Sequence, residues 1–217
     1  MIKTNFIHHG LEFEQRALVP RSSHLEGSDR FWNMDVLWPR KIAGKADLFS
    51  VDEGTAAFLK GLVLSTQPDM VFETGTHKGR STAAFIEGMD ESGRGEIWTV
   101  DMHDYGIDTS GAIPEESLHR LSKIVGRTPA VFGEEFFNDM PPINIAFLDG
   151  AHDDETLRAE IEFVRGHAAP NCIVLFDNAD DYGWPDVKVV IHDIFEDRLV
   201  NLPTCTGLSM VQIKKEL

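Results

Sequence analysis

The feature that most constrains the fold is a regular alternation of short apolar runs and amphipathic stretches, which begins near Ser50. We expect strands at 70–73, 97–100, 130–132, 143–148 and 172–176, and helices at about 50–66, 79–89, 115–125, 153–167 and 186–197. Strands that alternate with helices are typical of a parallel sheet covered by helices on both faces. The pattern therefore predicts an α/β fold with a doubly wound, Rossmann-like sheet.

The last two expected strands, 199–202 and 208–213, break this alternation. The connection between them, Pro203-Thr-Cys-Thr-Gly207, is too short for a crossover helix. We therefore expect an antiparallel hairpin at the C-terminal end, which completes a seven-stranded, mostly parallel sheet.

The N-terminal 45 residues lack this regularity, and the helical pattern starts only after them. Ser50-Val-Asp-Glu53 has the Ser-x-x-Glu form of a capping box, which predicts a helix start there. We divide the chain into an N-terminal arm or cap at 1–45 and a single domain at 46–217. Because exposed Phe31, Trp32 and Trp38 would leave an apolar patch, we expect the arm to cover a substrate crevice or to contact a second subunit of a homo-oligomer.

A glycine-containing turn, Glu73-Thr-Gly-Thr-His-Lys-Gly-Arg-Ser81, follows the first expected strand. Gly75 permits a sharp turn, and Gly79 lets the next helix pack closely against the sheet. The spacing differs from G-x-G-x-x-G, whose middle glycine lets a pyrophosphate approach the backbone. The sequence therefore does not predict a dinucleotide site, although a glycine-rich turn alone is common in α/β proteins.

Together with the terminal hairpin, this turn resembles the first motif of the class I S-adenosylmethionine-dependent methyltransferases. Glu73, Gly75, Gly79 and Ser81 match that motif. The resemblance implies that Gly75 and its neighbour Thr76 pass under the methionine part of the cofactor. It also implies that Glu73 orients the cofactor's amino group, directly or through water.

The same resemblance assigns cofactor contacts to the ends of later strands. Asp101 stands where the family binds the ribose hydroxyls, and a carboxylate can accept a hydrogen bond from both. Gly133 and Glu134, after the third expected strand, stand where adenine would lie, and Asp149 follows the fourth strand. The implied cofactor is S-adenosylmethionine.

Asp149, Asp177 and Asn178 follow two neighbouring strands of the expected sheet. Parallel strands deliver their carboxyl ends to one edge, so these side chains should converge. Carboxylate and amide oxygens suit Mg²⁺, Ca²⁺ or Mn²⁺ better than a structural zinc. Over residues 50–214 the chain resembles the metal-dependent O-methyltransferases of the catechol and caffeoyl-coenzyme A type, in which the matching residues hold one divalent ion.

One position departs from the catechol type, which has a lysine as general base three residues after the first ligand. This chain has His152, in a setting similar to the Asp-Gly-x-His of some metal-dependent sugar O-methyltransferases. A metal lowers the pKa of a bound hydroxyl, and a neutral imidazole then accepts its proton near pH 7. The sequence thus predicts divalent-metal-assisted O-methylation of a hydroxylated small molecule or sugar, with His152 as the catalytic base.

Several alternatives stay open at this point. His152 also fits a helix-start residue, and an Asp-Asn pair also fits a strand-end turn. The chain could be a metal-independent methyltransferase acting on another acceptor, an enzyme similar to cephalosporin hydroxylase, or a catalytically inactive S-adenosylmethionine-binding protein. Metal-dependent turnover separates the first interpretation from these. His103, Asp104, Tyr182 and Trp184 are further candidates for lining the pocket.

Composition limits the partners and the compartment. The formal net charge of −16 disfavours duplex nucleic acid and anionic membrane surfaces, because phosphate binding depends on clustered lysine and arginine. No apolar run approaches the roughly 20 residues that a bilayer crossing needs, and no signal peptide is recognisable at the N-terminus. Cys172 and Cys205 form no metal-binding spacing, which favours reduced thiols. We expect a cytoplasmic protein.

Overall fold

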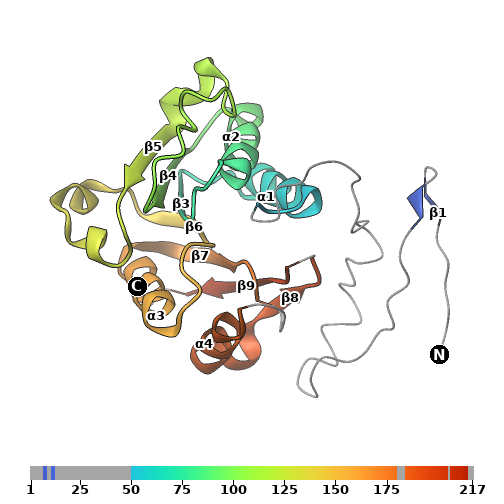
Figure 1. The fold of residues 1–217 in the computed structure, drawn as a ribbon, viewed down its shortest axis with the longest axis vertical. Helices are drawn as coiled ribbons and strands as arrows, with labels where there is room; N and C mark the ends of the chain where they lie inside the picture. The colour runs from blue at the N-terminus through green and yellow to red at the C-terminus, as the bar shows by residue number, and fades with distance from the viewer. Residues whose placement is uncertain (1–6, 9–10, 13–49, 180–183, 205, 215–217) are drawn as a thin grey trace.

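The computed structural model describes residues 7–8, 11–12, 50–179, 184–204 and 206–214 (Figure 1). Near the N-terminus, β1 (Ile7–His8) and β2 (Leu11–Glu12) pair in an antiparallel manner. The rest of the expected arm, with its boundary at residue 45, lies outside the described residues. Phe31, Trp32, Trp38, Tyr182 and Cys205 lie outside them as well.

Within the described chain, seven strands form one sheet in the order β5-β4-β3-β6-β7-β9-β8. The strands are β3 (Met70–Thr74), β4 (Glu96–Asp101), β5 (Leu121–Val125), β6 (Ile143–Leu148), β7 (Ala168–Phe176), β8 (Val200–Leu202) and β9 (Leu208–Ile213). Strands β3 to β7 are parallel, whereas β9 runs antiparallel to both β7 and β8. This arrangement confirms the predicted doubly wound, mostly parallel sheet with its C-terminal antiparallel hairpin.

Helices cover both faces of this sheet and make three layers (Figure 1). The α-helices are α1 (Glu53–Thr66), α2 (Arg80–Ser92), α3 (Asp154–His167) and α4 (Pro185–Phe195). Successive strand residues point to opposite faces, so Val71 packs in the core beneath α1 and α2 while Phe72 packs beneath α3 and α4. Among the described helices, none has the length and apolar character that crossing a membrane would require.

The start of α1 differs from the prediction. Asp52 is the N-cap, and its side chain accepts a hydrogen bond from the Thr55 amide at 2.9 Å. Ser50 lies outside the helix, with its hydroxyl 3.4 Å from Nδ1 of His77. The expected capping box of Ser50 and Glu53 is therefore wrong, because a carboxylate two residues closer to the helix takes the capping position.

The segments on either side of β5 (Leu121–Val125) also differ from the prediction. The expected helix at 115–125 is a short 3₁₀ helix, Glu115–Arg120, followed at once by β5. The expected strand at 130–132 is a 3₁₀ helix, Ala130–Gly133. Two further 3₁₀ helices span Glu135–Asp139 and Glu196–Arg198. Strand β5 lies at the edge of the sheet and pairs only with β4. It therefore carries polar residues, and no apolar run marks it in the sequence.

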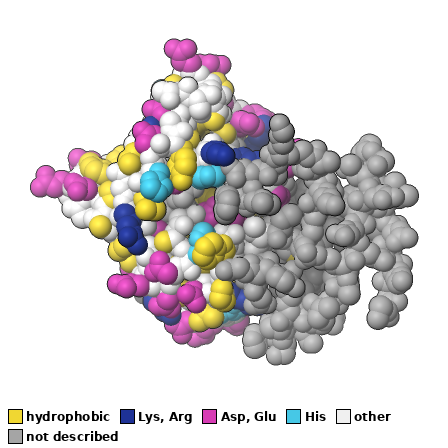
Figure 2. All heavy atoms as spheres, viewed as in Figure 1, with side chains coloured by type: hydrophobic (Ala, Val, Ile, Leu, Met, Phe, Trp, Pro, Cys, Tyr) yellow, Lys and Arg dark blue, Asp and Glu magenta, His cyan; other side chains and the backbone are white. Residues whose placement is uncertain are grey.

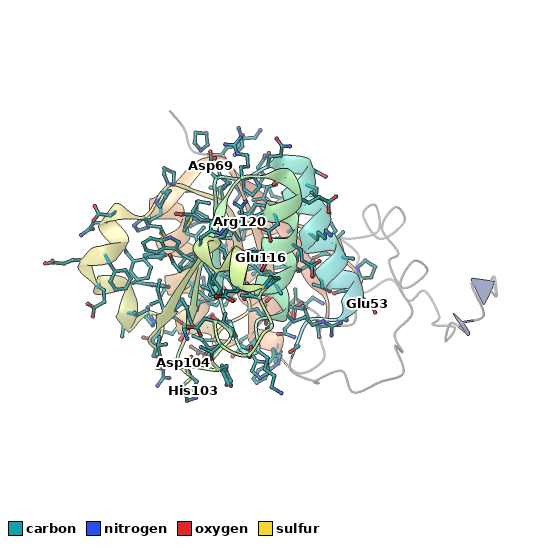
Figure 3. The ribbon with its side chains drawn as sticks, turned by 90° about the horizontal axis from the view of Figure 1, so that it is seen from above. Glu53, Asp69, His103, Asp104, Glu116 and Arg120 are labelled. Atoms are coloured by element: carbon teal, nitrogen blue, oxygen red, sulfur yellow. The ribbon has the colours of Figure 1, made fainter. Side chains whose placement is uncertain are left out.

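The amino ends and the carboxyl ends of the parallel strands lie on opposite sides of the sheet. Asp69 stands just before β3, whereas His103 and Asp104 follow β4, and Figure 3 shows them at opposite ends of the molecule. The loops that follow the strands gather at the carboxyl ends, on the side where His103 and Asp104 lie. In open α/β sheets this is the edge at which ligands bind.

Candidate active site

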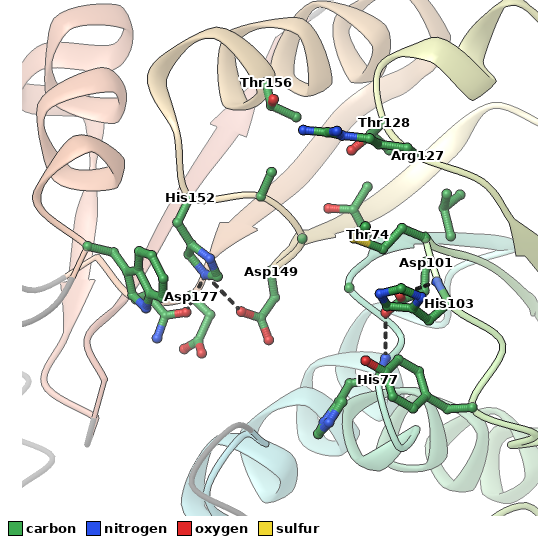
Figure 4. A pocket seen from close by; sticks show the side chains of 18 of the residues that line it. Thr74, His77, Asp101, His103, Arg127, Thr128, Asp149, His152, Thr156 and Asp177 are labelled. Carbon is green, nitrogen blue, oxygen red and sulfur yellow. Dashed lines mark hydrogen bonds and ion pairs between the residues drawn. The ribbon is translucent and has the colours of Figure 1, made fainter.

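A cavity of about 590 Å³ opens at the carboxyl ends of the parallel strands. Its walls come from the loops after β3, β4, β5, β6 and β7, and Figure 4 shows side chains from these loops pointing into it. Figure 2 shows histidine and hydrophobic side chains near the middle of the described surface, while acidic side chains occupy much of its outline. Residues far apart in the sequence are thus brought to one site.

The turn after β3 packs against the turn after β6 at Gly75. Gly75 has a positive φ of 85°, and a Cβ atom there would lie 2.1 Å from the carbonyl oxygen of Asp149. Its amide donates a hydrogen bond to the Val100 carbonyl at 2.9 Å. Only glycine fits this position, because any side chain would push the two turns apart.

Glu73 lies beneath the cavity and is fully buried. Thr82 and Thr99 donate hydrogen bonds to its Oε2 at 2.5 and 2.6 Å, and Thr76 in turn donates to the Thr99 hydroxyl at 2.5 Å. Its other oxygen, Oε1, is buried without a partner among the described residues. Burial raises the pKa of Glu73 to about 7, although hydrogen bonds from Ser81, Thr82 and Thr99 oppose that rise.

The residues of the first motif therefore divide into two groups. Gly75 lines the cavity, whereas Glu73, Thr76, Gly79 and Ser81 do not. Gly79 is the N-cap of α2, where a Cβ atom would come within 3.0 Å of the Ile107 side chain. These four residues lie outside the lining of the cavity in this structure.

Asp101, at the end of β4, joins two loops of the cavity wall (Figure 4). Its Oδ2 accepts a hydrogen bond from the His77 amide and its Oδ1 one from the His103 amide, both at 2.9 Å. The ring of Tyr105 lies between the two histidines, with centroid distances of 4.9 Å to His77 and 6.0 Å to His103. All four residues line the cavity; His77 and Tyr105 were not predicted from the sequence.

The expected adenine contacts at Gly133 and Glu134 are not at the cavity. Strand β5 ends at Val125, so Gly126, Arg127 and Thr128 are the residues that follow it and line the cavity. Glu134 instead lines a shallow hollow on another surface, beside Trp98 and Phe136. The expected strand at 130–132 is wrong, since β5 lies earlier in the chain, and the adenine contacts assigned to the residues after that strand stay a prediction.

The predicted catalytic and metal-binding residues meet at one side of the cavity (Figure 4). Nε2 of His152 lies 2.6 Å from Oδ1 of Asn178 and 3.5 Å from Oδ1 of Asp149. An amide oxygen only accepts, so Nε2 carries the proton and the lone pair is on Nδ1. The imidazole stacks on the Trp184 ring at a centroid distance of 4.5 Å, and Asp177 lines the cavity beside it.

Burial dominates the electrostatics on this side. It raises the pKa of Asp149 well above its ordinary value, with a further contribution from the charge of Glu73. The pKa of Asp177 is also raised, first by burial and then by the charge of Asp149. Burial lowers the pKa of His152, which favours a neutral imidazole.

This donor set fits a hard divalent cation. Among the described residues, no lysine or arginine forms a salt bridge with Asp149 or Asp177, and the charge of Asp149 contributes to the raised pKa of Asp177. The described chain holds no group of three acidic, histidine or cysteine side chains arranged for a metal. The protein would therefore supply two carboxylates and the Asn178 amide, and leave the other positions to water or substrate.

Comparison with known proteins decides the family. The model of the methyltransferase domain family matches residues 72–179, from the middle of β3 to just after β7. The chain is a class I S-adenosylmethionine-dependent methyltransferase. No curated protein matches this methyltransferase in sequence.

Solved structures share the fold of this methyltransferase. The O-methyltransferase TomG from Streptomyces achromogenes, solved with S-adenosylmethionine, has 15% identity and a TM-score of 0.62 over 87% of this chain and 99% of that chain. An O-methyltransferase from Bacillus cereus, solved with S-adenosylhomocysteine, has 19% identity and a TM-score of 0.58 over 91% and 93%. CalS11, a TDP-rhamnose 3′-O-methyltransferase, has 18% identity and a TM-score of 0.56 over 73% and 77%.

Glu160 of α3 contacts two residues that line the site of the methyltransferase and was not predicted from the sequence. Its side chain is fully buried behind the cavity and accepts hydrogen bonds from the hydroxyls of Thr74 and Thr128. A signal was present, because Glu160 interrupts the apolar stripe formed by Leu157 and Ile161 on the same helix. A carboxylate at a buried helical position indicates a polar partner in the core.

Proposed function

We propose that this methyltransferase transfers a methyl group to a hydroxyl oxygen of a small molecule or sugar. In the proposal a divalent cation is held by Asp149, Asp177 and Asn178, and His152 is the general base. The observation that carries it is the convergence of these side chains, with His152 Nε2 at 2.6 Å from Asn178 and 3.5 Å from Asp149. A strand-end turn or a helix start explains each residue separately but not their meeting.

The cofactor would lie across the cavity from His152. Asp101 retains free lone pairs for ribose hydroxyls, because each of its oxygens accepts only one of the described backbone hydrogen bonds. Gly75 lets the chain pass close beneath the ligand, and Gly126 and Thr128 take the adenine role expected earlier of residues 133–134. Figure 4 shows Asp101 and His152 on opposite sides of the cavity, so a cofactor held at Asp101 would face His152 across it.

The residues on that side would handle the proton of the acceptor. When bound, a divalent cation supplies positive charge that lowers the pKa of the acceptor hydroxyl. His152 accepts the hydroxyl proton at Nδ1, while Asn178 holds the ring by its Nε2–H group. The methyl group moves from the sulfonium to the oxygen, which leaves S-adenosylhomocysteine, the methyl ether and a protonated His152. The names of TomG and CalS11 support a hydroxyl acceptor and, for CalS11, a sugar.

The second candidate is methyl transfer without a metal. The 2.6 Å hydrogen bond from His152 to Asn178 favours it, because Asn178 then has a positioning role that needs no cation. The two candidates differ in what Asp177 does. In the first its carboxylate holds the cation, and in the second it has no direct part in the proton transfer.

A pair of variants separates the candidates. Mn²⁺ would be titrated into the S-adenosylhomocysteine-bound protein, and methylation of a panel of catechols, sugars and sugar nucleotides would be followed with and without EDTA. Asp177→Ala should lose Mn²⁺ binding and activity but keep cofactor binding. Asp154→Ala, at an exposed carboxylate on the solvent side of α3, is the matched control. It should keep Mn²⁺ binding, activity and cofactor binding.

The outcome for His152 completes the test. His152→Ala should lower the rate by about 10²–10⁴-fold and spare Mn²⁺ binding, the usual effect of losing a positioned base. If EDTA leaves the turnover of the wild type unchanged, the result would support methyl transfer without a metal.

A further inference from the structure

Glu160 is a buried carboxylate that the proposed chemistry does not use. It lies in α3, has no exposed surface, and accepts hydrogen bonds at Oε1 from the Thr128 hydroxyl at 2.7 Å and at Oε2 from the Thr74 hydroxyl at 3.2 Å. These two donors come from different loops of the cavity wall, one after β5 and one at the end of β3.

A third loop closes around the same carboxylate. A Cβ atom on Gly150, in the turn after β6, would lie 3.1 Å from Oε1 of Glu160 and 3.0 Å from the Thr74 side chain. The carboxylate therefore fills the space where three loops of the cavity meet. A shift of any of these loops would change its hydrogen bonds.

Core packing alone does not explain a carboxylate at this position. Leu157, Ile161 and Val164 form the buried stripe of α3 around it, and an apolar side chain would continue the stripe without a desolvation cost. Burial raises the pKa of Glu160 to about 7, and hydrogen bonds from the two threonines only partly oppose this. A residue with such a desolvation cost is typically retained where it contributes to a functional site.

We infer that Glu160 is a positioning residue that holds the loop after β5, through Thr128, in the conformation that receives the adenine end of the cofactor. The inference rests on the proposed placement of the cofactor. At the start of this loop, the Gly126 amide donates to the Asp101 carbonyl at 2.8 Å, and two residues later Thr128 is held by Glu160. Without the carboxylate, the second of these attachments is lost while Arg127 and Thr128 still face the cavity.

Binding of S-adenosylhomocysteine, measured by calorimetry, tests this role without any methyl acceptor. Glu160→Leu should weaken binding by about tenfold, which corresponds to losing the one hydrogen bond, from Thr128, that holds the loop after β5. Glu160→Gln should recover part of the affinity, because its amide oxygen still accepts from one hydroxyl. Glu162→Gln, at an exposed carboxylate two residues away on α3, is the matched control and should bind as the wild type does.

A double-mutant cycle distinguishes positioning from a general loss of stability. Thr128→Val should also weaken binding, and the double variant should lose less affinity than the sum of the two single losses, since both single variants remove the hydrogen bond from Thr128 to Glu160. If Glu160→Leu fails to fold, Thr128→Val and Glu160→Gln carry the test.

Two results would overturn the inference: wild-type affinity in folded Glu160→Leu or Thr128→Val protein, or losses that simply add in the double variant. Failure of the wild type to bind S-adenosylhomocysteine is a different result, which would overturn the cofactor placement itself.

Discussion

Ionisation of Glu73 should make the protein less stable as the pH rises. The carboxyl group is fully buried, one of its oxygens has no partner among the described residues, and its pKa is raised from 4.5 to about 7. Because the folded pKa lies above the unfolded one, the folded state binds more protons between these values. The stabilising contribution is therefore complete below pH 4.5 and is lost as the pH rises through 7.

The size of the effect follows from the two pKa values. Each unit of pKa difference corresponds to about 1.4 kcal/mol, so the contribution of Glu73 to the free energy of unfolding should fall by about 2.5 kcal/mol between pH 5 and pH 8.5. Glu73→Gln has no ionisable group at this position. The difference in stability between variant and wild type should therefore move in favour of the variant by about that amount over the same range.

Urea unfolding of the cofactor-free proteins at pH 5 and pH 8.5 measures this difference. The other titrating groups are common to both proteins and cancel in the comparison, except for Asp149, whose pKa the charge of Glu73 raises. Glu162→Gln, at an exposed carboxylate, controls for the replacement of a glutamate as such. A difference between Glu73→Gln and wild type that is the same at both pH values would refute the reasoning and would mean that Glu73 is solvated or charged throughout.

Two further predictions concern the cavity wall. Gly75→Ala should abolish S-adenosylhomocysteine binding in calorimetry, because the new Cβ would lie 2.1 Å from the Asp149 carbonyl oxygen; unchanged affinity would show that the two turns can separate freely. Asp101→Ala should weaken the same binding by at least about tenfold, since it removes an acceptor for ribose and releases the His77 and His103 amides. Wild-type affinity in that variant would place the ribose elsewhere.

The central strands could be predicted from the sequence because they are buried on both faces. Residues 70–74 have no exposed position, and 143–148 is nearly as buried, so each appears as an apolar run. The hairpin followed from the short connection between 202 and 208. These features depend on local sequence and on the general rules of parallel sheets, and they fixed the location of the site.

The edge strand could not be predicted in the same way. Leu121–Val125 contains Ser122 and Lys123 and is half-exposed along most of its length, because only β4 pairs with it. Ala130 to Phe132 is the more apolar segment but forms a 3₁₀ helix after Pro129. The adenine contacts were expected at Gly133 and Glu134 because they follow that segment, and these two residues do not line the cavity.

Convergence at the sheet edge was predictable, but contacts between side chains were not. The order of the strands indicated that Asp149 and Asp177 would meet. The hydrogen bond from His152 to Asn178 and the stack on Trp184 depend on side-chain directions that no spacing specifies. The buried hydrogen bonds of Glu160 likewise join it to Thr74 and Thr128, which lie 86 and 32 positions away in the chain.

Calorimetric titration of the full chain with S-adenosylhomocysteine, S-adenosylmethionine and NAD tests the central claim most directly. The account predicts binding of both sulfur ligands at one site per chain and no heat with NAD, because the turn at Gly75 lacks the glycine spacing that accommodates a pyrophosphate. Binding should also raise the melting temperature, since a ligand that binds only the folded state stabilises it. The absence of heat with both sulfur ligands, or binding of NAD in their place, would contradict the account.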